Sequence, residues 1–365
     1  MKNTFGQSVS VTLFGESHGD AVGAVLDGIA PGIKIDMECM TAQLALRAAG
    51  GPLSTSRKEP DQPQILSGVF QGYTTGTPIC ILIRNTNTRS SDYGDIRYKP
   101  RPGHADYTAQ MKYHGFQDYR GGGHFSGRIT AALVAAGSIA LAALRKKNIY
   151  IGTHLLRCAG ISDRAFENIE ADVRAVADKE FAVLDDEAGR QMREKILQAK
   201  SELDSVGGVL QTAVTGMPAG VGEPWFDAVE SMLAHALFAV PAVKGVEFGA
   251  GFAMADMRGS AANDEFEVRD GRIVTRTNNN GGINGGITNG MPIIFNCAVK
   301  PTASIARSQQ TVDLENMFQT ALSIHGRHDP AIVHRARAVV NAVTALVLCD
   351  ALAQRFGTDY IGGSI

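Results

Sequence analysis

The sequence has few cysteines, and they are not arranged for a metal site or a disulfide framework. The five cysteines, Cys39, Cys80, Cys158, Cys297 and Cys349, are scattered and odd in number, and no C-x-x-C pair occurs. This spacing argues against both a disulfide scaffold and a structural zinc site. No two histidines stand four residues apart on a predicted helix. We therefore expect reduced, mostly buried cysteines and no metal.

An excess of positive charge is also absent. The chain has 35 lysines and arginines against 37 aspartates and glutamates, so its formal net charge is −2. Binding to duplex nucleic acid depends on a basic surface excess. We therefore expect no nucleic-acid partner, although local basic clusters are compatible with this composition.

No segment has the length and composition of a signal peptide or a membrane span. The polar residues 15–20 fall where the apolar core of a signal peptide would lie. The longest apolar segment, residues 129–144, is rich in alanine and glycine and is shorter than the roughly 20 residues needed to cross a bilayer. We expect a cytoplasmic protein without membrane segments.

Predicted strands and helices alternate along the whole chain. Alternating or β-branched patterns predict strands at residues 8–14, 64–70, 78–84, 149–159, 207–217, 244–249 and 292–299. Helices are predicted at 36–49, 105–113, 129–144, 223–238 and 331–354, within 163–205, and between Ser304 and His325. No linker divides the chain. The pattern predicts one α+β unit over residues 1–365, which could consist of two similar halves.

Three consecutive glycines stand between Arg120 and Arg128, immediately before the most apolar helix. Glycine has no side chain to bury and loses the most backbone entropy on ordering. With Ser126 as the predicted N-cap, the loop would bring bare N–H groups and the positive end of a helix dipole towards an anion or a flat ring. A tight chain reversal explains the glycines alone equally well. The segment is neither a Walker A loop nor a clear G-x-G-x-x-G motif.

Other polar loops contain candidate site residues. His18 lies between glycines where a predicted strand ends, which favours a site role over a core role. His104 follows a Pro-Gly turn, and an ordinary surface histidine is the alternative interpretation. Arg47 ends a predicted helix, where it could cap carbonyl groups or bind a ligand. A second glycine-dense segment, residues 278–290, is either a disordered linker or an ordered loop. Ile283 and Ile287 at fixed offsets, followed by the strand-like residues 292–299, favour the ordered loop.

Together these loops favour an anionic substrate and proton transfer. Guanidinium groups pair with carboxylate and phosphate in two-pronged hydrogen bonds, and imidazoles exchange protons near neutral pH. No strand–elbow–helix context supports Ser17 as a nucleophile activated by His18. The set comprises Arg47, Arg101, Arg120, Arg128, Arg327, His18, His104 and Asp329.

Five segments, in order, resemble the signatures of the chorismate synthase family: residues 14–19, 101–106, 120–128, 300–302 and 326–330. The resemblance covers nearly the whole chain as one chorismate synthase-like domain. It implies an α+β fold in which antiparallel sheets sandwich central helices. It also implies conversion of 5-enolpyruvylshikimate 3-phosphate to chorismate by anti 1,4-elimination, the last step of the shikimate pathway, with reduced FMN as cofactor.

The resemblance also assigns roles to residues. His18 would be the acid beside the departing phosphate, His104 would protonate the reduced flavin, and Asp329 would assist proton removal. The substrate's phosphate and carboxylates would be bound by Arg47, Arg101, Arg128 and Arg327. Flavin contacts would come from His124, Phe125, Ser126, Pro241, Ala242, Gly285, Lys300, Pro301, Thr302, Ala303, Ser304 and Arg327.

The sequence departs from the family pattern in one place. Many relatives have a dense arginine cluster after the first helix, whereas here Arg47 is followed by seven small or apolar residues and the next arginine is Arg57. We expect Arg57 to replace a substrate or NADP contact. Relatives form homotetramers, and no reductase domain is visible, so we expect an external source of reduced flavin.

Two other functions are compatible with the same residues. One is a different reduced-flavin-dependent lyase of a phosphorylated acid. The other is a non-catalytic regulator that binds FMN or an anion. Three acid–base groups on separate loops argue against the regulator, because passive binding does not need them.

Overall fold

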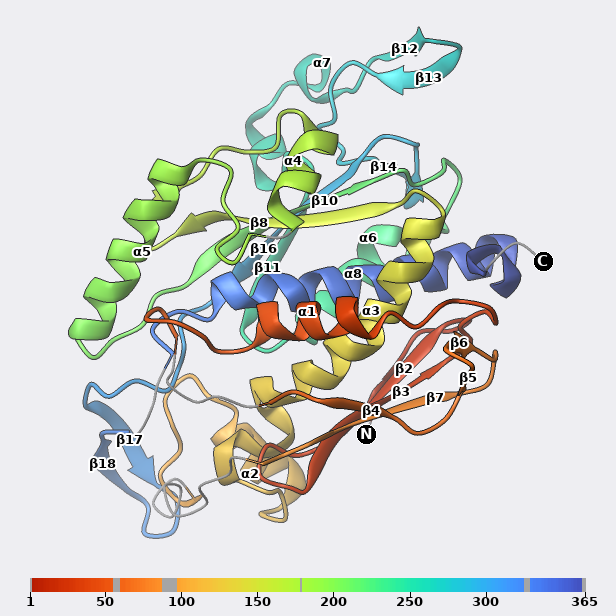
Figure 1. Ribbon diagram of the computed structural model, residues 1–365. Coiled ribbons are helices and arrows are strands. Elements are labelled where there is room, and N and C mark those ends of the chain that lie inside the picture. Colours follow the sequence, from red (N-terminus) through yellow and green to blue (C-terminus); the bar gives the residue numbers. More distant parts are fainter. Residues whose placement is uncertain (1, 55–59, 87–96, 178, 325–328, 363–365) are drawn as a thin grey trace.

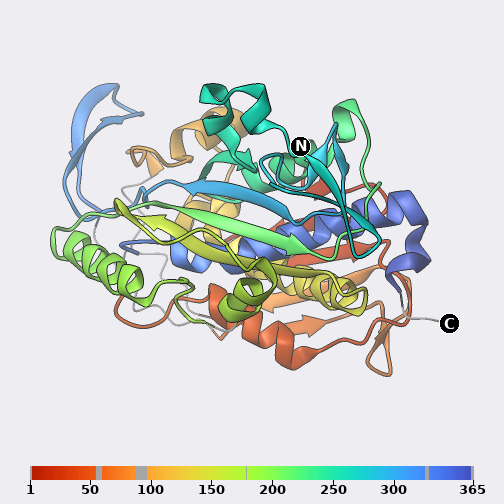
Figure 2. The same cartoon turned by 90° about the horizontal axis from the view of Figure 1, so that it is seen from above.

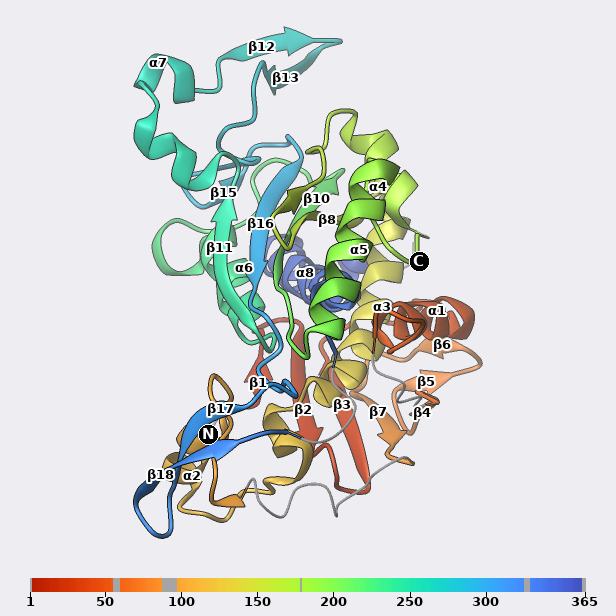
Figure 3. The same ribbon diagram turned by 90° about the vertical axis from the view of Figure 1, so that its left-hand side faces the viewer.

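A computed structural model describes residues 2–54, 60–86, 97–177, 179–324 and 329–362. Two five-stranded antiparallel sheets lie on opposite sides of a layer of helices (Figures 1 and 3). The predicted α+β class, with sheets around central helices, is confirmed.

The first sheet is built from the N-terminal part of the chain. Its strands, in spatial order, are β1 (Thr4–Phe5), β2 (Ser10–Gly15), β3 (Ala21–Asp27), β7 (Ile79–Arg84) and β4 (Pro63–Ile65). In β7 the isoleucines alternate with less buried residues, so Ile79, Ile81 and Ile83 face the core. The strands predicted at 8–14 and 78–84 are confirmed.

No strand was predicted at β3, and the prediction for the segment that follows β4 was wrong. Residues 64–70 were expected to form one strand joined to 78–84 through a glycine turn. Instead β4 pairs directly with β7, and β5 (Val69–Phe70) pairs with β6 (Tyr73–Thr74) in a separate small hairpin. Gly68, at a φ of 77°, lets the chain turn between these two pairings.

The second sheet is seen from above in Figure 2. Its strands, in order, are β11 (Val243–Phe248), β16 (Ile293–Val299), β10 (Gly208–Thr215), β8 (Tyr150–Cys158) and β9 (Ile161–Ser162). All four longer strands lie where the sequence predicts them. Outside this sheet pack α4 (Ile169–Ala177) and α5 (Asp186–Ser201), within the charged segment 163–205.

The two longest helices, both largely apolar, cross between the sheets. They are α3 (Thr130–Lys146) and α8 (Val333–Phe356), close to the ranges predicted. A Cβ on Gly137 would lie 2.4 Å from the Cβ of Ala342, so the glycine lets the two helices approach closely. Asp36 caps α1 (Met37–Arg47), which packs against both.

Both central helices have the length and composition of a membrane span. The segment Gly127–Lys146 has 20 residues and Val333–Phe356 has 24. The expectation that the apolar segment is too short was therefore wrong, because the turn before α3 extends the helical segment. The most apolar stretches of the two are 83% and 89% buried within the fold, so both are core helices here.

The prediction of a helix between Ser304 and His325 is wrong. That segment forms a hairpin of β17 (Gln309–Asp313) and β18 (Phe318–Leu322) at the edge of the molecule, on the side of α2 (Figure 1). The carboxylate of Asp313 accepts hydrogen bonds from the N–H groups of Glu315 and Asn316, and Met317 adopts a φ of 56°. This turn chemistry reverses the chain where a helix would have continued.

The remaining elements are peripheral. The helix predicted from residue 223 starts later, because Ala228 is extended between the turn Trp225–Asp227 and α6 (Val229–Phe238). The glycine-dense segment 278–290 is ordered and contains the pair β14 (Ile283–Asn284) and β15 (Ile287–Thr288). The others are α2 (Asp106–Tyr113), α7 (Gly259–Ala262), β12 (Phe266–Arg269) and β13 (Arg272–Thr275).

Candidate functional site

The three glycines form a kinked turn that other residues could not adopt. Gly121, Gly122 and Gly123 have φ angles of 60°, 87° and 53°, in the left-handed region that favours glycine. A Cβ on Gly121 would lie 2.3 Å from Cε1 of His18, and one on Gly123 would lie 2.0 Å from the carbonyl oxygen of Asp118. The glycines therefore serve close approach as well as chain reversal.

The glycine loop is bonded to the loop that contains His18. The N–H of Ser17 donates to the carbonyl of Gly123 at 3.0 Å, and Nδ1 of His124 lies 2.8 Å from the carbonyl oxygen of Gly15. His18 is only 7% exposed. Its ring packs against Gly121, so its position depends on the glycine loop.

His104 packs against the next glycine in the loop. A Cβ on Gly122 would lie 3.2 Å from Cε1 and 3.4 Å from Nε2 of His104. Two consecutive glycines thus bring both predicted catalytic imidazoles to one loop, although the histidines are far apart in the sequence. Residues His104, Asp106, Gly122 and Phe125 also line one small pocket.

A carboxylate and a guanidinium fix the orientation of His104. Nδ1 of His104 lies 2.7 Å from Oδ1 of Asp106, and Arg101 donates to both carboxylate oxygens of Asp106 at 2.7 Å. Burial raises the pKa of Asp106, but hydrogen bonds from Arg101 and His104 outweigh it and hold the pKa well below its usual range. Asp106 therefore stays ionised, and the Nε2 edge of His104 is left towards the glycine loop.

The segment 300–304 meets the His104 loop from the other half of the chain. Arg101 donates to the hydroxyl of Ser304 at 3.0 Å, and the ammonium of Lys300 donates to the carbonyl of Gly103. The N–H of Lys300 also donates to the carbonyl of Ala242 at 2.9 Å. The flavin contacts expected at 241–242 and 300–304 therefore lie together beside His104.

Two of the predicted substrate arginines share one carboxylate. Asp61 pairs with Arg47 at 3.3 Å and with Arg128. Arg128 is 5% exposed and also donates to the side chain of Asn85 at 2.8 Å. Both arginines are therefore held in position by groups on neighbouring loops.

Asp329 joins this cluster through α8. Arg335, in the first turn of that helix, pairs with the carboxylate of Asp329 at 2.5 Å and donates to the carbonyl of Arg47 at 3.0 Å. The guanidinium of Arg335 thus contacts both the predicted base, Asp329, and the backbone of the predicted substrate arginine, Arg47.

Some predicted residues lie elsewhere or outside the described part of the chain. Gly285 is exposed in the turn between β14 and β15. Arg120 pairs with Asp118 at the surface, at 2.8 Å. Ser126 caps the turn before α3, as predicted, by accepting the N–H of Arg128, while the ring of Phe125 packs edge-on against Tyr113. Arg57 and Arg327 lie outside the described residues.

The sequence did not single out Asp61, Asn85, Asp106 or Arg335. Asp106 stands in the same motif as His104, so its two-residue spacing was an available signal. The other three are single polar residues in unremarkable segments. Only their contacts with predicted residues reveal them.

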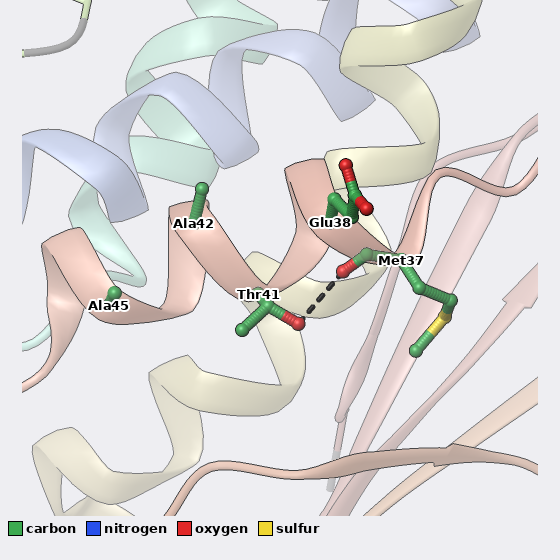
Figure 4. Close-up of a pocket in the computed structure, with 5 residues that line it drawn as sticks. All are labelled: Met37, Glu38, Thr41, Ala42 and Ala45. Carbon is green, nitrogen blue, oxygen red and sulfur yellow. Dashed lines mark hydrogen bonds between the residues drawn. The ribbon is translucent and has the colours of Figure 1, made fainter.

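Pocket shape alone would point to a different place. One surface depression is lined only by residues of α1, Met37, Glu38, Thr41, Ala42 and Ala45 (Figure 4). Its single drawn hydrogen bond, from the Thr41 hydroxyl to the carbonyl of Met37, lies within the helix. It contains none of the predicted site residues, so the chemistry favours the glycine loop. Within the described ranges, no three His, Cys, Asp or Glu side chains group to hold a metal ion.

Comparisons with known proteins agree on one family. The family model described as chorismate synthase matches residues 9–353. A chorismate synthase of Pyrococcus abyssi is 49% identical over 347 residues, covering 95% of this chain and 96% of that protein. One of Dehalococcoides mccartyi is 47% identical over 359 residues and covers 98% of each. A crystal structure of chorismate synthase matches with a TM-score of 0.75 at 29% identity, covering 96% and 93%.

Proposed function

The chain belongs to the chorismate synthase family, as its motifs predict, and from this premise we propose how it performs the reaction. The protein is a lyase of the shikimate pathway that forms chorismate. We propose that it acts on 5-enolpyruvylshikimate 3-phosphate by anti 1,4-elimination of phosphate and a ring proton, with reduced FMN required.

The observation that carries this proposal is the contact of both imidazoles with consecutive glycines. His18 packs on Gly121 and His104 on Gly122. An elimination needs a proton near the leaving group and a second proton-transfer group at a separate point. Two histidines on separate loops, both in contact with one turn, support both functions without any nucleophile.

The arginines support a substrate with several negative charges. Arg128 and Arg47 lie on one carboxylate, Asp61, and Arg101 lies beside His104. Guanidinium groups fixed by neighbours lose little freedom when they bind phosphate or carboxylate. We propose that they position the substrate so that its phosphate lies at His18.

The residues beside His104 fit a flavin. The hydroxyl of Thr302 is buried and has no hydrogen-bond partner among the described residues. Lys300 supplies a cation at the carbonyl of Gly103, in the same loop as His104. Phe125 presents a partly exposed ring at the pocket that His104 lines. Reduced FMN, when bound, supplies electron density to the substrate as phosphate departs. We propose that Lys300, Thr302, Ser304 and Phe125 hold it.

Each acid–base group then has one task. His18 holds a proton for the departing phosphate. His104 holds a proton at Nε2 towards the flavin, while Asp106 fixes its Nδ1 edge. Asp329, held by Arg335, accepts a proton. Arg327 and Arg57 are proposed to add substrate or NADP contacts, and Gly285, Pro241, Ala242, Pro301 and Ala303 to add flavin contacts.

One assay tests the proposed reaction. The purified protein is incubated with 5-enolpyruvylshikimate 3-phosphate and chemically reduced FMN without oxygen, and chorismate and phosphate are measured. We expect equal amounts of both products, and none with oxidised FMN. Absence of chorismate under reducing conditions would overturn the proposal. Turnover of another phosphorylated acid instead would indicate a different flavin-dependent lyase, and flavin binding without turnover would indicate a regulator.

A substitution at Arg128 tests the substrate contacts. Arg128→Ala should mainly raise KM for the phosphorylated substrate, because it removes a buried cation from the anion site. An unchanged KM would contradict this assignment. We also propose a cytoplasmic homotetramer supplied with reduced flavin by a separate reductase, which the mass in solution and activity with an added reductase would test.

A further inference from the structure

Asn85 connects the predicted acid to the predicted substrate arginine. It follows β7 directly and belongs to none of the five family-like motifs. Its Oδ1 accepts a hydrogen bond from Nε of Arg128 at 2.8 Å. Its Nδ2 donates to the carbonyls of Glu16 at 3.0 Å and Gly19 at 2.8 Å. One side chain thus contacts Arg128 and both ends of the tetrapeptide that contains His18.

The geometry of the first sheet explains this position. Residues 16–20 connect β2 to β3, and the last pair of residues before this connection is Gly15 with Val22. The neighbouring strand β7 ends level with this connection, because Arg84 pairs with Ala21. The N–H of Asn85 therefore reaches the carbonyl of Asp20 at 3.0 Å, and its side chain extends across the loop.

The loop of His18 is consequently held on two sides. On one side the glycine loop contacts it through Gly123, Gly121 and His124. On the other side Asn85 holds its two carbonyls. The Asn85 side chain that holds these carbonyls also accepts the hydrogen bond from Arg128. Arg128 is buried and also pairs with Asp61.

We propose that Asn85 is a positioning residue that makes the placement of His18 depend on Arg128. This inference rests on the proposed function of those two residues. When an anionic substrate engages Arg128, the hydrogen bond from Nε fixes the orientation of the Asn85 amide. The same amide then holds the carbonyls of Glu16 and Gly19, so His18 meets the leaving phosphate in its working position. Asn85 itself touches no reacting atom.

The substitution Asn85→Asp separates the two contacts. It keeps an oxygen for Arg128 but replaces both N–H donors with an oxygen that faces two carbonyls. We expect kcat to fall about 10- to 100-fold, as for a misplaced catalytic group, and KM to rise, because the new carboxylate adds a negative charge beside Arg128. Asn85→Ser, which loses all three side-chain contacts, should lower kcat similarly and also raise KM. An unchanged kcat in both variants would overturn the proposal.

Asn279→Asp is the matched control. Asn279 also donates to two backbone carbonyls, those of Ala261 and Ala262 at 3.1 and 3.2 Å, at the C-terminal end of α7. The same chemical change there should leave kcat near wild type. An equal fall in kcat would overturn the proposal, because it would indicate a general effect of loosening loops. Thermal unfolding confirms folding, and if Asn85→Asp does not fold, Asn85→Ser carries the test.

A double-mutant cycle with His18→Ala distinguishes positioning from stability. If Asn85 acts through His18, Asn85→Asp should change kcat by less than about twofold once His18 is alanine. Independent, multiplying losses would overturn the coupling. His18→Ala with wild-type turnover would instead contradict the proposed role of His18, and the failure of that premise is therefore visible separately.

Discussion

Among the described residues, two histidine–aspartate pairs have nearly the same geometry, but only one of these two leaves the outer ring nitrogen of its histidine open to a ligand. In the His104 pair, Nδ1 lies 2.7 Å from Asp106, and in the His154 pair it lies 2.9 Å from Asp163. The side chains of the first pair are 20% and 11% exposed, whereas those of the second are completely buried.

The difference lies at the second ring nitrogen. Nε2 of His154 lies 3.2 Å from Oε1 of Gln211, an oxygen that also accepts the N–H of Phe166. The ring of Phe166 packs edge-on against His154, with 4.6 Å between ring centroids. Nε2 of His104 instead faces glycine, which has no side chain to block it. A histidine–aspartate pair therefore indicates a site only where the outer nitrogen can meet a ligand.

The largest expected effect comes from a substitution in the proposed catalytic pair, His104 and Asp106. His104→Ala should lower turnover by about 10²- to 10⁴-fold through loss of general acid–base help, with flavin affinity almost unchanged. Steady-state kinetics under anaerobic conditions and a flavin titration measure the two quantities. His154→Ala is the control in the other pair and should keep wild-type turnover per folded molecule. Equal losses of turnover in both variants would contradict the comparison.

The structural pair should show its importance in stability. Asp163→Ala leaves His154 buried without its partner, so the free energy of unfolding should fall by about 3–5 kcal/mol. Denaturant unfolding measures this change. Asp106→Ala, in the more exposed pair, should lose clearly less, and the reverse order would contradict the interpretation of the two pairs.

The same carboxylate predicts the direction of a pH effect. Burial raises the pKa of Asp163, but hydrogen bonds from His154 and from the N–H groups of Leu184 and Asp185 outweigh it and lower the pKa. Its contribution to stability is therefore present above the unfolded value of about 3.9 and is lost as pH falls through the lower folded value. Acid unfolding of Asp163→Asn should depend less steeply on pH in this range.

A methyl group on the glycine loop tests the contact between Gly121 and His18. Gly121→Ala places a Cβ where the imidazole lies and strains a φ of 60°, so turnover should fall by about 10²-fold through misplacement. Gly259→Ala is the control, because a Cβ there meets no atom within 4 Å and should change little. Wild-type turnover in Gly121→Ala would show that the loop can move without cost to His18.

The smallest expected effect is at the carboxylate that orients His104. Asp106→Asn keeps the shape of the side chain, so we expect turnover to fall about 10-fold, a fraction of the full acid–base contribution. Because hydrogen bonds hold the pKa of Asp106 well below its usual range, its charge is constant from pH 5 to 9. Steady-state kinetics of Asp106→Asn and wild type at one pH measure this fall in turnover, and wild-type turnover in the variant would contradict the orienting role of Asp106.

The sequence predicted regular elements well where local patterns were strong. The apolar runs of α3 and α8 and the alternation in β7 and β16 identified elements close to their observed limits. It failed where a turn decided the outcome: the β17–β18 hairpin depends on the Asp313 turn, and β5–β6 depends on the glycine conformation at residue 68. Short turns of this kind give a weak periodic signal.

The residues of the candidate site likewise fall into those that the sequence predicted and those that it did not. The motif residues could be predicted as site residues, because loops rarely need glycine clusters, histidines and arginines for packing and because the order of the motifs matched a family. Asp61, Asn85 and Arg335 were not readable, because a single polar residue has no period or motif. Because Arg47 ends a helix, the sequence could not decide whether it caps carbonyl groups or binds a ligand. Its ion pair with Asp61, which also pairs with Arg128, now places it beside another predicted substrate arginine.

By itself, the sequence determined the α+β class, the two buried helices, the family and the loops of the proposed site, because these depend on local composition and ordered motifs. The tertiary structure decided which of two histidine–aspartate pairs is open to a ligand and how His18 is connected to Arg128. It also showed why three glycines stand in a row. Those properties depend on distances between residues far apart in the chain, and only the packing of the two sheets around α3 and α8 sets these distances.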